Sequence, residues 1–178
     1  MTAIERDRVI TPEVTKPRKT FVLLTAGILA MVVGFGSMAG GIFGAWYTYD
    51  QAVAQDVTTP DDAAIPETAV RGPFTMWAQA NIITTHQLDS TEGLYFSQME
   101  RTVPQLDENG AAVLDENGEA VMVPNEARAS WLTATTLTTA LGLGVMSYAL
   151  SALAIATGLT LFFTGFVFLY IRKRAVIL

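Results

Sequence analysis

The stretch Phe21–Tyr49, FVLLTAGILAMVVGFGSMAGGIFGAWYTY, contains no Lys, Arg, Asp, Glu or His. A second uncharged block, Trp131–Ile171, is longer still. Because about 20 apolar residues at ~1.5 Å each cross the ~30 Å hydrocarbon core of a bilayer, both blocks predict transmembrane helices. We therefore expect an integral membrane protein.

The second block could hold one span or two. As one helix its 41 residues (131 to 171) are about 60 Å long, roughly twice the thickness of a bilayer. Two spans would place the basic run Arg172–Arg174 outside the cell, so one long helix fits the charges better. The second half of this helix, Tyr148–Ile171, is the expected span. Its first half is more polar and rich in threonine, and we expect that half to leave the membrane or to cross its outer interface.

Basic residues orient the two spans. Five precede the first span and three follow the second: Arg6, Arg8, Lys16, Arg18, Lys19, Arg172, Lys173 and Arg174. Residues 50–130 carry only three basic side chains against fourteen acidic ones, a net charge of −11. Short basic flanks stay on the cytoplasmic side, which predicts a plasma-membrane protein with both termini inside and residues 50–130 outside. The acidic domain would repel phosphate, so nucleic acid is not an expected partner. Membrane lipid is an expected partner because of the two apolar spans.

These boundaries give a cytoplasmic arm (1–20), a first span (21–49), an acidic outer domain (50–130), a long helix (131–172) and a cytoplasmic tail (173–178). The predicted fold is mainly α, a two-helix transmembrane hairpin with a small extracytoplasmic α+β domain. The basic start and Ala52-Val-Ala54 also resemble a cleavable signal peptide. The apolar block exceeds the ~7–15 residues of a signal peptide's apolar region, so we interpret it as a retained anchor.

Small residues mark possible helix-packing surfaces. Gly36, Gly40 and Gly44 form a tandem GxxxG stripe on the first span, which allows close approach of backbones. The alternative is that glycine is simply common in membrane helices. The second span offers pairs of small residues for the first helix or for a partner: Ser147/Ser151, Ala152/Ala156 and Ala154/Gly158.

Within the outer domain, Pro73–Asp89 predicts an amphipathic helix. Proline suits the first helical position, and five apolar side chains trace much of one face: Phe74, Trp77, Ala78, Ile82 and Leu88. Such a helix could lie on the membrane surface, on another subunit or on its own chain.

A repeat follows this helix. Leu106-Asp-Glu-Asn-Gly110 recurs as Leu114-Asp-Glu-Asn-Gly118, and each Asn-Gly is a strong turn signal. With valines flanking the turns, the segment Thr102–Pro124 predicts a short β-ribbon with two turns. Calcium binding is disfavoured, because neither copy has the oxygen ligands of an EF-hand loop.

The sequence predicts no catalytic residue, no metal site and no cofactor. His86 is the only histidine, too few for a non-haem iron site or a bis-histidine haem, and a surface or hydrogen-bonded role is expected. Cysteine is absent, and no nucleophile elbow, HExxH, P-loop or dinucleotide-binding motif occurs. What remains are helix-packing surfaces and an acidic domain, which favour a scaffold.

The run Gly72–Leu88, GPFTMWAQANIITTHQL, resembles the motif G-P-F-T-A-[YW]-A-Q-A-[DN]-I-I-x-x-H-x-L of a small family of actinobacterial membrane proteins. Thr91, Gly93 and Tyr95 or Phe96 continue the pattern. The likeness is strong over Arg71–Met99 and general over the spans. The LDENG ribbon is an insertion relative to the short family loop, and the N-terminal arm is longer than usual.

Family members are often labelled aromatic ring-opening dioxygenases, a name that this sequence contradicts because the iron ligands are missing. The resemblance implies instead an accessory subunit, similar to one known from corynebacteria, of the supercomplex that joins cytochrome bc to cytochrome c oxidase. The expected function is non-catalytic stabilisation of the oxidase, with oxidase and cytochrome bc subunits as partners. The alternative is a membrane-anchored assembly factor. Besides the glycine stripe, five residues of the outer helix are the expected interface: Phe74, Trp77, Gln79, Asn81 and His86.

Overall fold

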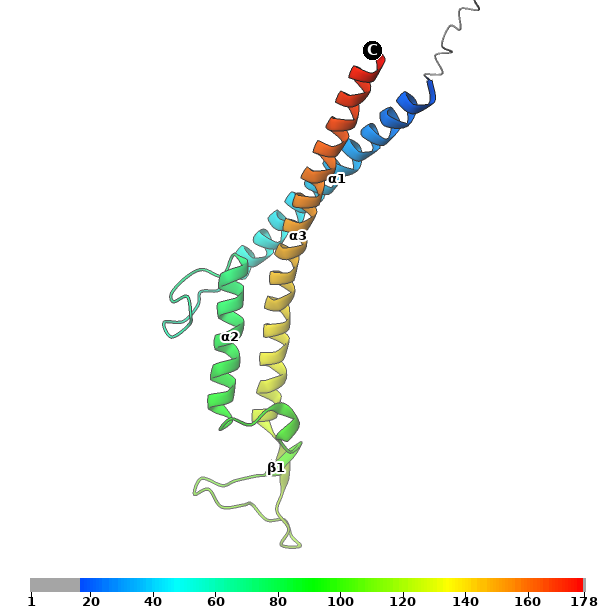
Figure 1. Ribbon diagram of the computed structural model, residues 1–178. Helices are drawn as coiled ribbons and strands as arrows, with labels where there is room; N and C mark the ends of the chain where they lie inside the picture. The colour runs from blue at the N-terminus through cyan, green and yellow to red at the C-terminus, as the bar shows by residue number, and fades with distance from the viewer. Residues whose placement is uncertain (1–16, 178) are drawn as a thin grey trace, which may run out of the picture. The chain divides into compact units, whose positions relative to one another are not determined.

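The computed structural model describes residues 17–177, with side chains from Thr20 to Arg174. Most of this part of the chain lies in three helices, α1 (Pro17–Ala54), α2 (Pro73–Ser90) and α3 (Glu126–Ile177) (Figure 1). A 3-10 turn, η1 (Phe96–Gln98), and two strands, β1 (Thr102–Pro104) and β2 (Met122–Pro124), lie between α2 and α3. Residues 1–16 of the predicted cytoplasmic arm lie outside the described residues.

Two of the helices are long and apolar enough to cross a membrane, over Thr20–Ala54 and Glu126–Arg174. The prediction of one continuous second helix is confirmed, because α3 runs unbroken for 52 residues. It begins five residues before the uncharged block. Asn125 stands at that start, where its side-chain oxygen accepts a hydrogen bond from the Arg128 backbone N–H at 3.3 Å, as an N-cap residue does.

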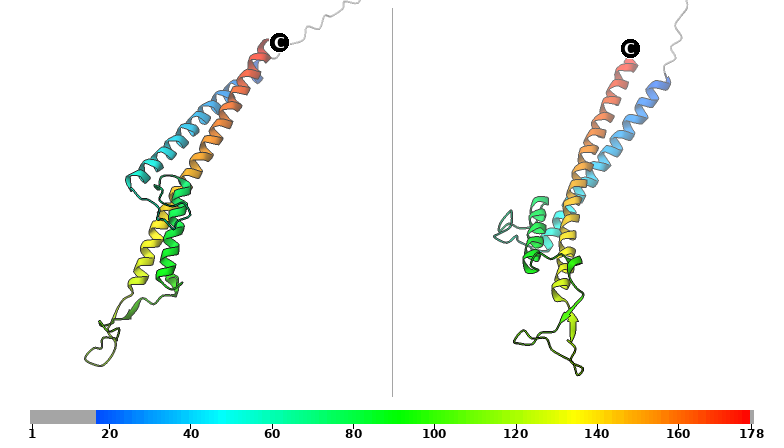
Figure 2. Two further views of the ribbon diagram at one scale, coloured as in Figure 1. Left: turned by 90° about the vertical axis from the view of Figure 1, so that its left-hand side faces the viewer. Right: turned by 60° about the horizontal axis from the view of Figure 1, so that its bottom comes forward.

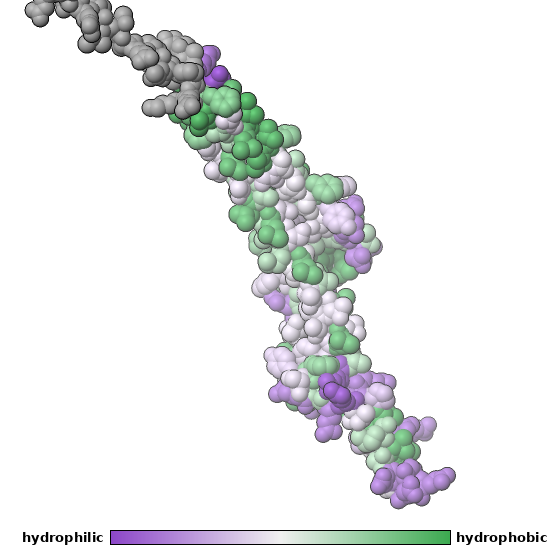
Figure 3. Space-filling view, turned by 90° about the vertical axis from the view of Figure 1, so that its right-hand side faces the viewer, coloured by the Kyte–Doolittle hydropathy of each residue, from purple (hydrophilic) through white to green (hydrophobic). Residues whose placement is uncertain are grey.

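The chain divides into two compact units. The terminal unit is bounded by Met1–Gly40 and Ala154–Leu178, of which the structure describes 17–40 and 154–177, and the central unit is Gly41–Leu153. In the terminal unit α1 and α3 pack antiparallel through glycines, with Gly27 beside Gly165 and Gly34 beside Gly158. The surface of this unit is mostly apolar on the face shown in Figure 3, as expected of lipid-facing helices.

In the central unit α2 lies along the first half of α3 (Figure 2). Ala78 and Ile82 of α2 and Ala134 of α3 are buried, and the Gln87 amide donates to the Ser130 hydroxyl at 2.7 Å. The prediction of a helix over 73–89 is confirmed, since α2 ends one residue later, at Ser90. Packing against its own chain therefore accounts for one side of α2.

The predicted ribbon with two turns is also confirmed, and its strands close into an unexpected arrangement. β1 pairs antiparallel with β2, and each LDENG turn forms its own small hairpin, closed by the bridges Leu106↔Ala112 and Leu114↔Ala120. The three hairpins meet at Gln105, Val113 and Val121. Gln105 N–H donates to the Val121 carbonyl at 2.7 Å, Val113 N–H to Gln105 at 2.8 Å, and Val121 N–H to Val113 at 2.8 Å.

We call Thr102–Pro124 the trefoil and these three residues its hub. The hub residues are eight positions apart, which is the period of the LDENG repeat. The repeat thus produces a cyclic set of three backbone hydrogen bonds with approximate threefold symmetry. Gly110 and Gly118, each with φ +81°, supply the left-handed turn residue that glycine adopts without a steric penalty.

Candidate functional site

The start of α2 is built by the first residues of the GPFT sequence. Pro73 occupies the first helical position. The Thr75 hydroxyl oxygen accepts hydrogen bonds from the backbone N–H groups of Arg71 and Gly72, both at 3.1 Å. From α3, the Tyr148 hydroxyl donates to the Arg71 carbonyl at 2.7 Å. Gly72, Pro73 and Thr75 therefore fix where α2 begins and how that end lies against α3.

The end of α2 is held by Thr91, Gly93 and a tryptophan from α3. Gly93, with φ +79°, donates its N–H to the Leu88 carbonyl at 2.8 Å. The buried Trp131 donates its indole N–H to the Leu94 carbonyl at 2.9 Å, with the Thr91 hydroxyl at 3.3 Å. This end of α2 is thus joined to the first turns of α3 by a buried hydrogen-bond network.

The opposite side of α2 remains uncovered. Phe74 is 76% exposed and Trp77 is 53% exposed, and Asn81, one turn further along, is also exposed. The apolar residues that were expected to share one face of this helix therefore divide between two faces. Ala78 and Ile82 pack inside the central unit, whereas Phe74 and Trp77 point away from it. Residues one apart lie ~100° apart around a helix, so Trp77 and Ala78 belong to different faces.

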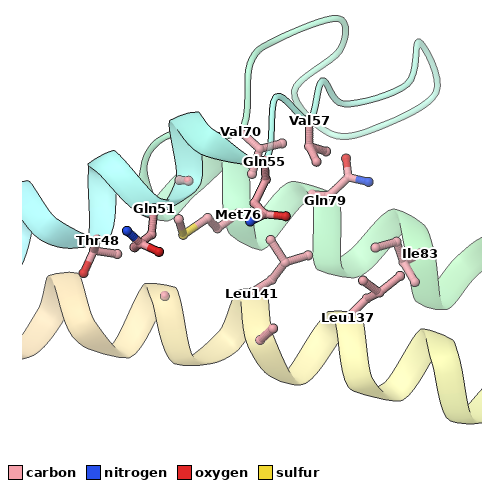
Figure 4. Close-up of a pocket in the computed structure, with 13 residues that line it drawn as sticks. Thr48, Gln51, Gln55, Val57, Val70, Met76, Gln79, Ile83, Leu137 and Leu141 are labelled. Atoms are coloured by element: carbon pink, nitrogen blue, oxygen red, sulfur yellow. The ribbon is translucent and has the colours of Figure 1, made fainter.

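Gln79 lines a cavity of about 510 Å³ formed by α1, α2, α3 and the segment between α1 and α2 (Figure 4). The polar lining consists of Gln79 with Thr48, Gln51 and Gln55 of α1, and the rest is apolar. No lining residue carries an ionisable side chain, so these walls offer no general acid or base. The Gln79 side-chain oxygen is buried without a hydrogen-bond partner among the described residues.

His86 lies on the exposed side of α2 and pairs with Asp62, with His86 Nε2 2.7 Å from Asp62 Oδ2. This hydrogen bond is the main reason that the pKa of Asp62 is lowered from its ordinary value of 3.8. The pair fastens the irregular segment between α1 and α2 onto the surface of α2. A hydrogen-bonded surface histidine was the expectation, and the structure supplies its partner, 24 residues away.

Of the glycine stripe of the first span, Gly44 alone lies at the contact between the two long helices. A Cβ at Gly36 or Gly40 would meet nothing within 4 Å, and one at Gly44 would meet only the Ser151 hydroxyl oxygen, at 2.8 Å. The close contact in the terminal unit uses Gly27 and Gly34 instead. Gly34 and Gly36 are ~200° apart around α1, so Gly36 faces away from the side that carries Gly34. Gly36 and Gly40 stay a prediction as partner-facing positions.

Two signals in the sequence could have found the contacting stripe. Gly27 and Gly34 are seven residues apart, and so are Gly158 and Gly165; a seven-residue spacing keeps residues on one side of a helix. Of the expected small pairs of α3, Ala154 and Gly158 pack in the terminal unit, where Ser37 donates to the Ala154 carbonyl at 2.9 Å. In the central unit, Ser147 Oγ lies 2.6 Å from Thr48 Oγ1.

Trp131 and Tyr148 make hydrogen bonds to residues that flank α2, which the sequence did not predict. Each stands in the uncharged second block, where an aromatic residue is unremarkable in a membrane helix. Their hydrogen-bond partners, Leu94 and Arg71, are backbone carbonyls, which no side-chain pattern reveals.

The carboxylates of the LDENG turns bond to their own backbone. Asp107 Oδ1 accepts from the N–H groups of Ala111 and Asn109, both at 2.9 Å, and Asp115 repeats the pattern with Glu119 and Asn117. These backbone hydrogen bonds lower the pKa of both aspartates. Among residues 17–177, no three His, Cys, Asp or Glu side chains are grouped as metal ligands would be.

Together these features define a mainly helical protein with two helices able to span a membrane, a third helix packed on its own chain and a small β module. Comparison with protein-family models, with curated proteins and with solved structures found no match to this chain.

Proposed function

We propose that this protein is a non-catalytic membrane subunit that binds a partner through the outward face of α2, defined by Phe74, Trp77 and Asn81. The observation that carries the proposal is the exposure of Phe74 and Trp77, 76% and 53%, on a helix whose other side is packed. Large aromatic side chains are the commonest anchors of protein interfaces.

The roles of the remaining motif residues support this choice of face. Gly72, Pro73 and Thr75 form the start of α2, and Thr91 and Gly93 form its end. Met76, Ala78 and Ile82 are buried inside the central unit. Phe74 and Trp77 have no comparable role within the described residues. A partner surface would give them one.

The resemblance of Gly72–Leu88 to the actinobacterial motif supports a particular partner. We propose that the subunit stabilises cytochrome c oxidase within a cytochrome bc–oxidase supercomplex, with both termini in the cytoplasm and residues 50–130 outside. The basic flanks and the net charge of −11 over 50–130 support that orientation.

Affinity purification of the oxidase from native membranes tests the partner. Wild-type protein is expected to copurify in fixed stoichiometry with mature oxidase, and the Phe74→Ala/Trp77→Ala variant to be lost. Removing interface anchors typically costs 2 kcal/mol or more, about a thirtyfold weaker association. Leu132→Ala, which removes an exposed apolar side chain of α3, is the matched control.

Two results would argue against the proposal. Association only with immature oxidase would favour the assembly-factor alternative, and equal copurification of both variants would exclude the α2 face. The orientation has its own test, because the chain has no cysteine. A cysteine placed at Glu108 should react with a membrane-impermeant maleimide in intact cells, whereas one in the cytoplasmic tail should not.

A further inference from the structure

The trefoil has one face made entirely of apolar residues. Leu106, Leu114 and Met122 each follow a hub residue, and the approximate threefold symmetry places them at equivalent positions. Directly opposite residues of an antiparallel pair project to the same side, and the three partners are also apolar: Ala112, Ala120 and Pro104. Alternation along a strand sends the hub side chains to the other side.

This face is uncovered. Leu106 is 61% exposed, Leu114 60% and Met122 50%. Three large apolar side chains are thus exposed on one side of a 23-residue module (102 to 124), and exposed apolar surface of this kind on a small domain commonly marks a binding surface.

The charges around the face restrict what can cover it. Residues 102–124 contain five acidic side chains and no basic one: Asp107, Glu108, Asp115, Glu116 and Glu119. A second copy of the trefoil would bring five further negative charges against them, and anionic lipid would do the same. A protein surface that carries Lys or Arg around an apolar centre is complementary in both respects.

We propose that the trefoil is a docking module for a basic protein surface with an apolar centre. Leu106, Leu114 and Met122 enter the contact, and Glu108, Glu116 and Glu119 pair with the partner's basic side chains at its rim. The Oδ1 atoms of Asp107 and Asp115 are engaged by backbone N–H groups, so these residues hold the turns in shape. The proposal is independent of the α2 face and of the oxidase as partner.

Site-specific photo-crosslinking in native membranes tests it, with benzoyl-phenylalanine at Leu106 or Leu114 of the full-length chain. Gln105 is the matched control, because it is an exposed neighbour that projects to the opposite side. We expect a protein adduct from Leu106 and Leu114 and little from Gln105, with the crosslinked segment of the partner rich in Lys and Arg.

Added salt and charge-reversal substitutions test whether the acidic side chains at the rim of the trefoil pair with basic side chains of the partner. Because the Debye length falls from about 10 Å at 0.1 M salt to about 3 Å at 1 M, the adduct yield should fall several-fold over that range. Glu108→Lys/Glu116→Lys/Glu119→Lys should lower it similarly, and amide hydrogen exchange at the hub would confirm that the variant keeps its fold. Absence of an adduct, an adduct with lipid or a second copy, or equal crosslinking from Gln105 would each overturn the proposal.

Discussion

Gly34 of α1 and Gly158 of α3 approach each other so closely that neither position has room for a Cβ. A Cβ on Gly34 would lie 2.7 Å from the Gly158 carbonyl oxygen, and a Cβ on Gly158 would lie 2.6 Å from the Gly34 carbonyl oxygen. Both obstacles are backbone atoms, which cannot move aside as a flexible side chain can. The helices of the terminal unit therefore depend on glycine at this contact.

Gly34→Ala should destabilise the helix pair by about 1–3 kcal/mol, the range of overpacking substitutions. Unfolding in mixed detergent micelles, followed by circular dichroism, measures the change. Gly36→Ala is the control, because nothing lies within 4 Å of its Cβ. It should be neutral or stabilising, since alanine forms helix better than glycine by about 1 kcal/mol. If both substitutions changed the stability of the helix pair equally, the assignment of Gly34 rather than Gly36 to the helix contact would be wrong.

Trp131→Phe should destabilise the central unit, whereas Trp77→Phe should not. The first change removes the indole donor to the Leu94 carbonyl. The loss costs about 1 kcal/mol, the usual net contribution of one hydrogen bond, because the carbonyl keeps its bond from the Thr91 hydroxyl. Trp77 is half-exposed, and surface substitutions usually fall within about 0.5 kcal/mol. Hydrogen exchange of amides at the end of α2 measures the difference. Faster exchange in Trp77→Phe than in Trp131→Phe would refute this assignment.

Acid should release the segment between α1 and α2 from the surface of α2. The pKa of Asp62 is lowered, chiefly by the hydrogen bond from His86. The stabilisation that the Asp62–His86 pair gives to this segment is therefore fully present above the ordinary pKa of 3.8. It is lost as the pH falls through the lowered pKa of Asp62. Limited proteolysis within 61–71 by an acid-active protease should accelerate over that range.

Asp62→Asn provides the control for the acid release. The amide cannot ionise, so just above the ordinary pKa of 3.8, where an acid-active protease still cleaves, its segment should be cleaved faster than wild type. It should show little further change on acidification. Asp61→Asn, a neighbouring substitution that leaves the His86 pair intact, should behave like wild type. A wild-type acid response in Asp62→Asn would assign the response to another group.

Gly110→Ala and Gly118→Ala should each weaken the trefoil by about 1–2 kcal/mol, because an L residue is disfavoured by that amount in the left-handed region. The hub links the hairpins in a cycle, so loosening one turn should speed amide exchange at Gln105, Val113 and Val121 together. Gly72→Ala, at φ −134° with nothing within 4 Å, should leave the hub unchanged. Exchange that changes only within the altered hairpin would show that the three hairpins are independent.

The sequence by itself determined the local elements of this protein. The basic run Arg172–Arg174 after the long uncharged block favoured one continuous α3 over two spans. Pro73 marked the start of α2. Each Asn-Gly predicted a turn that the structure contains. These features depend on hydrophobicity, backbone preference and spacing along the chain, which neighbouring residues decide.

The tertiary structure decided which faces meet. Both glycine stripes of α1 satisfy the spacing for close packing, and only the rotation of the helix in the terminal unit selects Gly34 over Gly36. In the same way, the burial of Ala78 and the exposure of Trp77 depend on where α3 lies beside α2. The hub joins residues eight and sixteen positions apart, and His86 meets a carboxylate 24 residues away. Which faces and residues meet depends on the free energy of contacts between segments far apart in the chain. A periodic pattern within one segment carries no information about those contacts.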